Sequence, residues 1–167
     1  PRPKEWPVPQ LRVPADEVHR WRQANGLGTG PAVALAPGSV GVSKRWPYYP
    51  EAARLSAERG LDVWVIGGPG EKALAQEIVA AGGPRVRDLT GADLRNGVLA
   101  MAAASVAISN DSGLMHIAAA IGTATVSVSP PAVDPEAIKT KIKAFISAYN
   151  SSVDLVRGQL NQKPVAD

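Results

Sequence analysis

The chain has 167 residues, of which 45% are hydrophobic and 20% are charged. This balance is typical of a soluble folded domain and excludes a disordered chain, so we expect one packed domain. Cysteine is absent and only two histidines are present, which excludes disulfides and argues against a structural zinc. The net charge of +3 suits an anionic ligand, but no basic run is dense enough to indicate a nucleic-acid partner.

The sequence also predicts where the protein acts. No stretch approaches the roughly 18 apolar residues of a membrane span, and the first residues lack the apolar segment of a signal peptide. We therefore expect a cytoplasmic protein with no membrane span. The chain begins with proline rather than methionine, and residues 1–14 are rich in proline, which predicts an extended linker and a chain cut from something longer.

Strands and helices alternate along the middle of the chain. A first helix is predicted at Ala15 to Ala24, where glycines end it. Short apolar runs typical of buried parallel strands follow at Ala32 to Ala36, Asp62 to Ile66, Val106 to Ser109 and Thr125 to Val128, with a shorter one at Val86 to Leu89. Helical patterns separate them at Glu51 to Arg59, Glu71 to Ala81, Leu94 to Ala104 and Leu114 to Ile121. This order predicts the α/β class, with a Rossmann-like doubly wound parallel sheet over residues 15–130.

Ligands of such a sheet bind beyond the carboxyl ends of the strands, so the loops that follow strands are the candidate site. The first, Ala36 to Pro47, combines glycines, small hydroxyl residues and cations. Glycine lets backbone N–H groups close on an anion and Lys44 adds a point charge, so Gly38, Ser39 and Lys44 are candidate ligands of a phosphate. A surface loop with solvated cations explains the same residues, and the spacing to Lys44 excludes a Walker loop.

The second loop, Ile66 to Lys72, leaves its strand through glycines and enters a helix whose first turn is expected to carry Glu71. A carboxylate there can accept hydrogen bonds from ribose hydroxyls. The helix dipole favours an acidic residue in the first turn of any helix, so a purely structural role stays open.

The third loop, Ser109 to His116, opens an alanine-rich helix with three consecutive capping residues and a glycine, more than capping one helix requires. Free N–H groups at this terminus suit a diphosphate. The candidate contacts are Asp111, Ser112, Gly113 and His116. His116 either touches the ligand through a ring N–H or is a half-buried histidine without one.

The charged side chains of this site are expected to have different roles. Asp111 would repel a phosphate bound at the same helix terminus, so we expect it to accept hydrogen bonds from sugar hydroxyls. Lys44 and the helix terminus would then carry the phosphate charge that builds up as a diphosphate leaves.

Three segments match, in order and spacing, those of the ADP-heptose:lipopolysaccharide heptosyltransferases, glycosyltransferase family 9: Ala36-Pro37-Gly38 with Lys44-Arg45-Trp46-Pro47, Gly67-Gly68, and Asn110-Asp111-Ser112-Gly113-Leu114-Met115-His116. The chain resembles the carboxyl-terminal, donor-binding half of the family's GT-B fold over about residues 11–125. The resemblance implies inverting transfer of heptose from ADP-heptose to the lipopolysaccharide inner core, without a metal or other cofactor. It places Lys44 and Asp111 on the donor, Ser112 and Gly113 at the diphosphate, and Glu71 on the ribose.

The family's amino-terminal half, which binds the acceptor and supplies the catalytic base, is absent from this sequence. We therefore expect no catalytic residue in this chain and no turnover without that partner domain, so whether the chain is an enzyme by itself stays open. The full enzyme would be cytoplasmic and peripheral to the inner membrane.

Residues 131–167 form a predicted helical tail, for which an origin foreign to the domain is one interpretation. Its apolar stripe is Ile138, Ile142, Phe145, Ile146, Tyr149 and Val153. The segment 134–160 weakly resembles a helix of flagellar filament-capping proteins, which suggests a fused chain that self-associates. A last helix docked on its own domain explains the stripe equally well.

Three functions therefore remain open from the sequence. The first is a donor-binding domain that needs a partner for turnover. The second is a non-catalytic chimeric or scaffold protein that assembles through its tail. The third is another GT-B enzyme, such as a nucleotide-sugar epimerase, with the same fold and a different substrate.

Overall fold

The structure, a computed structural model, describes residues 10–130 and Ser147. The chain divides into two units, Pro1–Pro130 and Pro131–Asp167, and the fold described below belongs to the first. The predicted apolar stripe of the tail and its self-association concern positions outside the described residues, as do positions 1–9 of the predicted linker.

A five-stranded parallel sheet forms the centre of the domain. Its strands are β1 (Ala32–Ala36), β2 (Asp62–Val65), β3 (Val86–Asp88), β4 (Val106–Asn110) and β5 (Ala124–Val128), in the order β3-β2-β1-β4-β5. Every neighbouring pair is parallel, and Leu35 of β1 pairs with Val65 on one side and Ile108 on the other. The strand order reverses beside β1, which makes the sheet doubly wound and confirms the predicted fold class.

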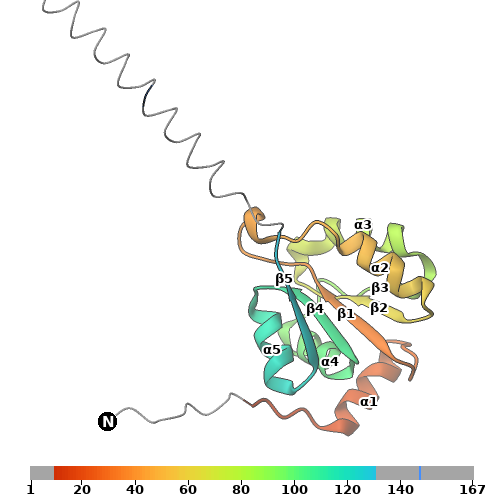
Figure 1. The fold of residues 1–167 in the computed structure, drawn as a ribbon. Coiled ribbons are helices and arrows are strands. Elements are labelled where there is room, and N and C mark those ends of the chain that lie inside the picture. Colours follow the sequence, from red (N-terminus) through yellow and green to blue (C-terminus); the bar gives the residue numbers. More distant parts are fainter. Residues whose placement is uncertain (1–9, 131–146, 148–167) are drawn as a thin grey trace, which may run out of the picture. The chain divides into compact units, whose positions relative to one another are not determined.

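Helices cover both faces of the sheet (Figure 1). They are α1 (Ala15–Ala24), α2 (Tyr49–Glu58), α3 (Lys72–Gly82), α4 (Leu94–Ala103) and α5 (Gly113–Ile121). Short 3₁₀ turns lie at η1 (Val42–Lys44), η2 (Pro69–Glu71) and η3 (Gly83–Arg85). Helices α1, α4 and α5 lie on one face and α2 and α3 on the other.

The core consists of two apolar layers that share the buried strands. Alternate residues of a strand point to opposite faces, so Ala34 packs with Trp64 and with Met101 of α4, whereas Leu35 packs with Ile78 of α3. All five of these side chains are buried. Small alanines in the central strand leave room for the large Trp64 ring, which explains how a core with few aromatic residues still fills its volume.

Three helices begin at positions that differ from the predicted ones: α5 begins at Gly113, one residue before the predicted Leu114, and proline is the cause in the other two. Pro50 occupies the first turn of α2, so this helix begins at Tyr49 rather than Glu51. Pro69 starts the 3₁₀ turn η2, in which the N–H of Glu71 donates to the carbonyl of Gly68 at 3.2 Å. Helix α3 therefore begins at Lys72, and the prediction that its first turn carries Glu71 is wrong.

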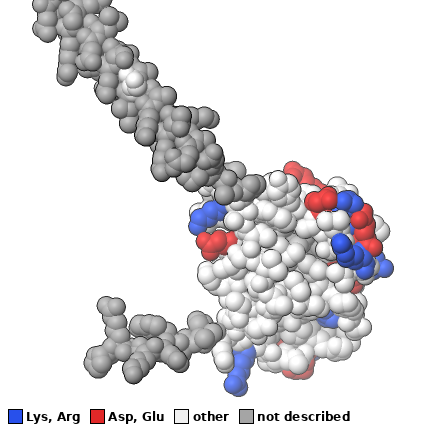
Figure 2. Space-filling model, viewed as in Figure 1, with Lys and Arg blue, Asp and Glu red and all other residues white. Residues whose placement is uncertain are grey.

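Charge is sparse over the last helix and the last strand of the domain. Residues 112–128 contain no Asp, Glu, Lys or Arg, and Figure 2 shows a broad uncharged face with charged side chains along its borders. Asp111, directly before this stretch, is the one Asp, Glu, Lys or Arg between positions 96 and 130. The charge at the start of α5 is thus set by very few side chains.

Candidate functional site

A cavity of about 500 Å³ lies where the loops that follow β1, β2 and β4 meet. All eight residues predicted to bind the donor line this polar cavity: Gly38, Ser39, Lys44, Glu71, Asp111, Ser112, Gly113 and His116. Val40, Gly67, Gly68 and Leu114 complete its lining. The structure therefore brings the three loops together at one edge of the sheet, while the donor-binding role of each residue stays a prediction.

The amino-terminal end of α5 opens onto the polar cavity without a side-chain cap. Ser112 occupies the N-cap position with extended backbone, yet its side chain accepts no hydrogen bond from the helix. Its hydroxyl lies 3.1 Å from that of Ser109 instead. A Cβ placed on Gly113 would meet no atom within 4 Å, so packing does not demand a glycine there. The free N–H groups and the open space suit an anionic ligand.

An exposed cluster of charge faces these amides. Lys44 Nζ lies 3.5 Å from Asp111 Oδ2, and His116 Nε2 lies 3.8 Å from Asp111 Oδ1. More than half of each of these side chains is exposed, with exposed fractions of 57%, 65% and 72%. Ion pairs this exposed add little to stability, so Lys44 can exchange Asp111 for a bound anion at small cost.

Glu71 reaches across the polar cavity over three glycines. A Cβ on Gly38 would lie 3.1 Å from Glu71 Cδ, and a Cβ on Gly67 would lie 3.0 Å from Glu71 Cβ. These glycines thus make room for a side chain, a role that the sequence interpretation missed when it assigned glycine to anion binding. Within residues 10–130 the structure gives the Glu71 carboxylate no hydrogen bond or ion pair, which leaves it available to ligand hydroxyls.

Ser39 also has an unused polar atom. Its Oγ is shielded from solvent and has no hydrogen-bond partner in the part of the chain that the structure describes. Because buried polar atoms are normally paired, this hydroxyl marks a place where a ligand group would be stabilising.

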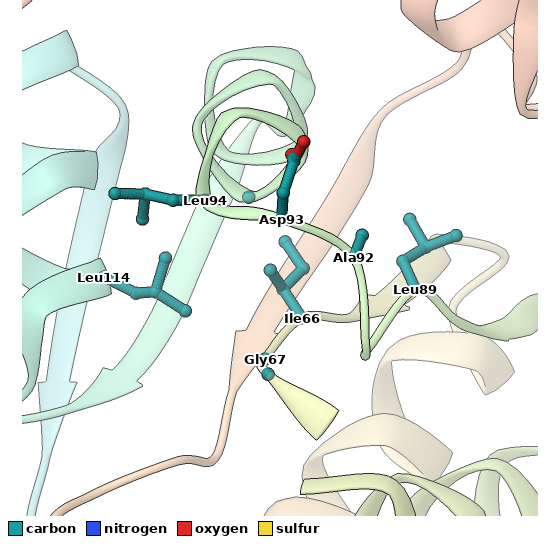
Figure 3. A pocket seen from close by; sticks show the side chains of 9 residues that line it. Ile66, Gly67, Leu89, Ala92, Asp93, Leu94 and Leu114 are labelled. Carbon is teal, nitrogen blue, oxygen red and sulfur yellow. The ribbon is translucent and has the colours of Figure 1, made fainter. Parts of the chain in front are cut away.

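An apolar cavity of about 260 Å³ adjoins the polar one. The two share Gly67, Gly68 and Leu114, and the apolar cavity continues between β2, β3 and α4 through Ile66, Leu89, Ala92, Asp93, Leu94 and Gly97. Figure 3 shows the side chains of Ile66 and Leu114 pointing toward each other across it. Sequence reasoning missed this cavity because aliphatic residues near strand ends resemble ordinary core. Leu94 at its rim is apolar yet 68% exposed, but this exposure is visible only in the structure and left no signal in the sequence.

Asp93 lies at the rim of the apolar cavity but serves α4. Its carboxylate accepts hydrogen bonds of 2.8 Å from the backbone N–H of Asn96 and 2.7 Å from the Asn96 side chain. These hydrogen bonds lower the pKa of Asp93 below its ordinary value. Figure 3 shows the carboxylate turned toward α4, so it caps the helix and does not face the cavity.

Among residues 10–130 and Ser147, no three His, Cys, Asp or Glu side chains are grouped so that they could hold a metal ion. In that same portion of the chain, no helix is long and apolar enough to cross a membrane.

Comparison with known proteins gives the family. The profile of "Glycosyltransferase family 9 (heptosyltransferase)" matches residues 2–165. The chain belongs to this family. Lipopolysaccharide heptosyltransferase 2 of Escherichia coli K12 is 31% identical over 163 residues, which cover 90% of this chain and 46% of the relative. The family resemblance that the loop motifs predicted is thus confirmed.

Solved structures of the family share the fold. The Escherichia coli ADP-heptose lipopolysaccharide heptosyltransferase II has a TM-score of 0.70 and 32% identity, with 80% of this chain and 42% of that chain covered. A family 9 glycosyltransferase from Veillonella parvula has a TM-score of 0.63 at 20% identity, with 81% and 46% covered. The domain thus has the Rossmann-like fold of these enzymes.

The extent of the match also matters. The chain spans less than half the length of the curated relatives it matches. The profile match continues beyond residue 125, where the loop resemblance was expected to end, to residue 165 in the tail. A foreign origin of the tail stays a prediction.

Proposed function

We propose that this chain is the donor-binding part of a heptosyltransferase that transfers heptose from ADP-heptose to the lipopolysaccharide inner core. In this proposal the chain alone binds the donor without turnover, because the acceptor site and the catalytic base belong to a domain outside this sequence. Support comes from the family and from the relative of 32% identity, which is an ADP-heptose enzyme.

One observation supports this function best: a polar and an apolar cavity adjoin each other at the carboxyl ends of the strands and share Gly67, Gly68 and Leu114. A nucleoside diphosphate sugar has the same division, because its base is flat and largely apolar while its diphosphate and sugar are polar. The apolar cavity between Ile66, Leu94 and Leu114 suits the base. The polar cavity, with Lys44 and the amino-terminal end of α5, suits the diphosphate.

In this proposal the groups of the polar cavity have different roles in the chemistry. Breaking the bond from the sugar to the diphosphate leaves charge on the departing oxygen, and stabilising that charge lowers the barrier. Lys44 and the uncapped amides of α5 supply this stabilisation, so the proposal assigns no step to a metal ion. Glu71, seated between the glycines, accepts from the ribose hydroxyls, and Asp111 and His116 contact the sugar.

Donor binding changes the partner of Lys44. Before binding, Lys44 pairs with Asp111 at 3.5 Å. A diphosphate carries more charge than one carboxylate, so Lys44 would turn to it and free Asp111 to accept from sugar hydroxyls. The ion pair thus keeps both residues at the cavity until the donor arrives.

Isothermal titration calorimetry of the chain with ADP tests this function. We expect saturable binding in the micromolar to millimolar range, weaker for UDP if the apolar cavity distinguishes the bases. An absence of heat and of saturation at millimolar ADP contradicts the proposal. Tight binding of another nucleotide with none of ADP would instead favour a related GT-B enzyme with a different donor.

A further inference from the structure

Asn110 is a fully buried polar residue at the end of β4, directly before Asp111. Its Nδ2 donates to the carbonyl of Pro37 at 2.7 Å, and its Oδ1 accepts from the N–H of Trp46 at 3.0 Å. Pro37 and Trp46 are the two ends of the loop that carries Lys44. One side chain therefore holds both ends of the loop against the strand that leads into α5.

The loop between these ends has few other attachments. Residues 40, 41 and 43–45 are exposed, and Val40 is 97% exposed. Within the loop, the N–H of Lys44 donates to the carbonyl of Gly41 at 3.2 Å, which shapes η1 without fixing its place. Among the described residues, the remaining contact between this loop and the third loop is the exposed pair of Lys44 with Asp111.

Two neighbouring contacts also anchor this region, but neither of them holds the backbone atoms to which Asn110 bonds. The buried Tyr49 hydroxyl donates to the carbonyl of Ala36 at 3.1 Å, which anchors the end of β1 before the loop begins. The Trp46 ring packs edge-on against Tyr49 with centroids 5.2 Å apart, which anchors its side chain. The backbone of the loop at Pro37 and Trp46 is held by Asn110.

We propose that Asn110 is a positioning residue that sets the place of Lys44 relative to the amino-terminal end of α5 and thereby the affinity for the diphosphate. The inference rests on the proposed function for its ligand. A leucine has the same branching and the same number of side-chain non-hydrogen atoms but no polar atom, so it would leave one buried carbonyl and one buried N–H without partners. The loop would then shift to find partners, and Lys44 would move with it.

Three variants of the whole chain test this role. Asn110→Leu removes both hydrogen bonds and keeps the branching of the side chain. Asn110→Asp keeps an acceptor for the Trp46 N–H but loses the donor to Pro37. Thr123→Val is the matched control, because Thr123 Oγ1 donates to the carbonyl of Met101 at 2.9 Å, away from both cavities.

Hydrogen exchange gives a readout that does not depend on the ligand. In Asn110→Leu we expect the Trp46 amide to exchange at least about tenfold faster than in the wild type. In Asn110→Asp we expect Trp46 to retain most of its protection, while the amides of residues 38–41, beside Pro37, exchange faster. Thr123→Val should leave Trp46 unchanged. If the Trp46 amide of a folded Asn110→Leu protein exchanges at the wild-type rate, the positioning role of Asn110 is overturned. If that variant does not fold, unchanged exchange of the amides of residues 38–41, beside Pro37, in Asn110→Asp overturns the positioning role, because that variant loses the hydrogen bond to the Pro37 carbonyl.

Binding of ADP and of inorganic pyrophosphate gives the second readout. Both dissociation constants should rise about tenfold in Asn110→Leu and less in Asn110→Asp, with wild-type values in Thr123→Val. Equal losses in Asn110→Leu and Thr123→Val would show a general effect of destabilisation and overturn the positioning role. If the wild type binds neither probe, the proposed function fails. The hydrogen-exchange result still shows whether Asn110 holds the loop in place.

Discussion

The polar and the apolar cavity adjoin each other at Gly67 and Gly68 but are built in different ways. The polar cavity is lined by exposed charged side chains and loop backbone, including Lys44 and Asp111. The apolar cavity is lined by aliphatic residues that continue into the core, such as Ile66, which is 2% exposed. A single ligand that enters both therefore meets charge at one end and core packing at the other.

Because of this difference, substitutions in the two cavities should differ in how far they change ligand affinity and the free energy of unfolding. Exposed charges contribute little to the free energy of unfolding, so changes in the polar cavity should alter affinity with little loss of stability. Core side chains contribute strongly, so most changes in the apolar cavity alter both. Substitutions that add volume to the apolar cavity without removing core atoms are the sharper probes.

The largest expected effect is that of Lys44→Ala. Loss of a charge-assisted hydrogen bond should weaken ADP and pyrophosphate alike, by about tenfold to about a hundredfold in calorimetry. The thermal midpoint should stay close to that of the wild type. Arg45→Ala is the control, because Arg45 is an exposed neighbouring cation that lines neither cavity. A loss of equal size in both variants would indicate a general effect of net charge and not a specific contact.

The next effect separates the two cavities. Gly97 lies in α4 on the wall of the apolar cavity, and Gly97→Leu should fill that cavity. We expect ADP to bind about tenfold more weakly while pyrophosphate is unaffected. Gly97→Ala is the control, since its Cβ would lie 3.4 Å from Leu114 Cδ2, an ordinary contact. Equal weakening of both ligands by Gly97→Leu would contradict the placement of the base.

A smaller effect tests the position of the Glu71 side chain beside Gly38. A Cβ on Gly38 would lie 3.1 Å from the Glu71 carboxylate, so Gly38→Ala should displace it. We expect ADP affinity to fall about fivefold, with a smaller change for pyrophosphate, which has no ribose. Gly70→Ala provides the comparison, because a Cβ there meets nothing within 4 Å. If the two variants bind ADP with equal affinity, the assignment of Glu71 to the ribose is contradicted.

The smallest effect concerns the rim of the apolar cavity and depends on pH. Hydrogen bonds from Asn96 hold the pKa of Asp93 below its ordinary value in the folded chain. The stability that Asp93 contributes is therefore present above its unfolded pKa, near pH 4, and is lost as the pH falls through the folded pKa. In denaturant unfolding, Asp93→Ala should be less stable than the wild type at pH 7, and the difference should narrow at pH 3. A constant difference would show that the charge of Asp93 is not involved.

The sequence predicted the fold and the polar cavity because both follow from local patterns. Alternating strands and helices imply a doubly wound sheet, and parallel strands bring the loops after Ala36 and Ser109 to one edge. The residues of those loops, such as Lys44 and Asp111, carry chemistry that sequence reasoning recognises. Their meeting in one cavity therefore followed from topology.

The apolar cavity and the role of Asn110 could not be predicted in the same way. Ile66 and Leu114 have the composition of core residues, and whether a gap remains between them depends on packing in three dimensions. Asn110 appeared to be one of three capping residues, but it belongs to β4 and bonds to Pro37 and Trp46. Contacts between residues more than sixty positions apart leave no local pattern.

A nuclear magnetic resonance titration of the ¹⁵N-labelled chain with ADP tests most directly whether the two cavities hold one ligand. We expect the amide signals of Gly113 in the polar cavity and Gly97 in the apolar cavity to shift together with a single dissociation constant. Pyrophosphate should shift the amide signal of Gly113 and leave the amide signal of Gly97 unchanged. If ADP shifts neither amide, or shifts only one of them at saturation, the account of a shared donor site is contradicted.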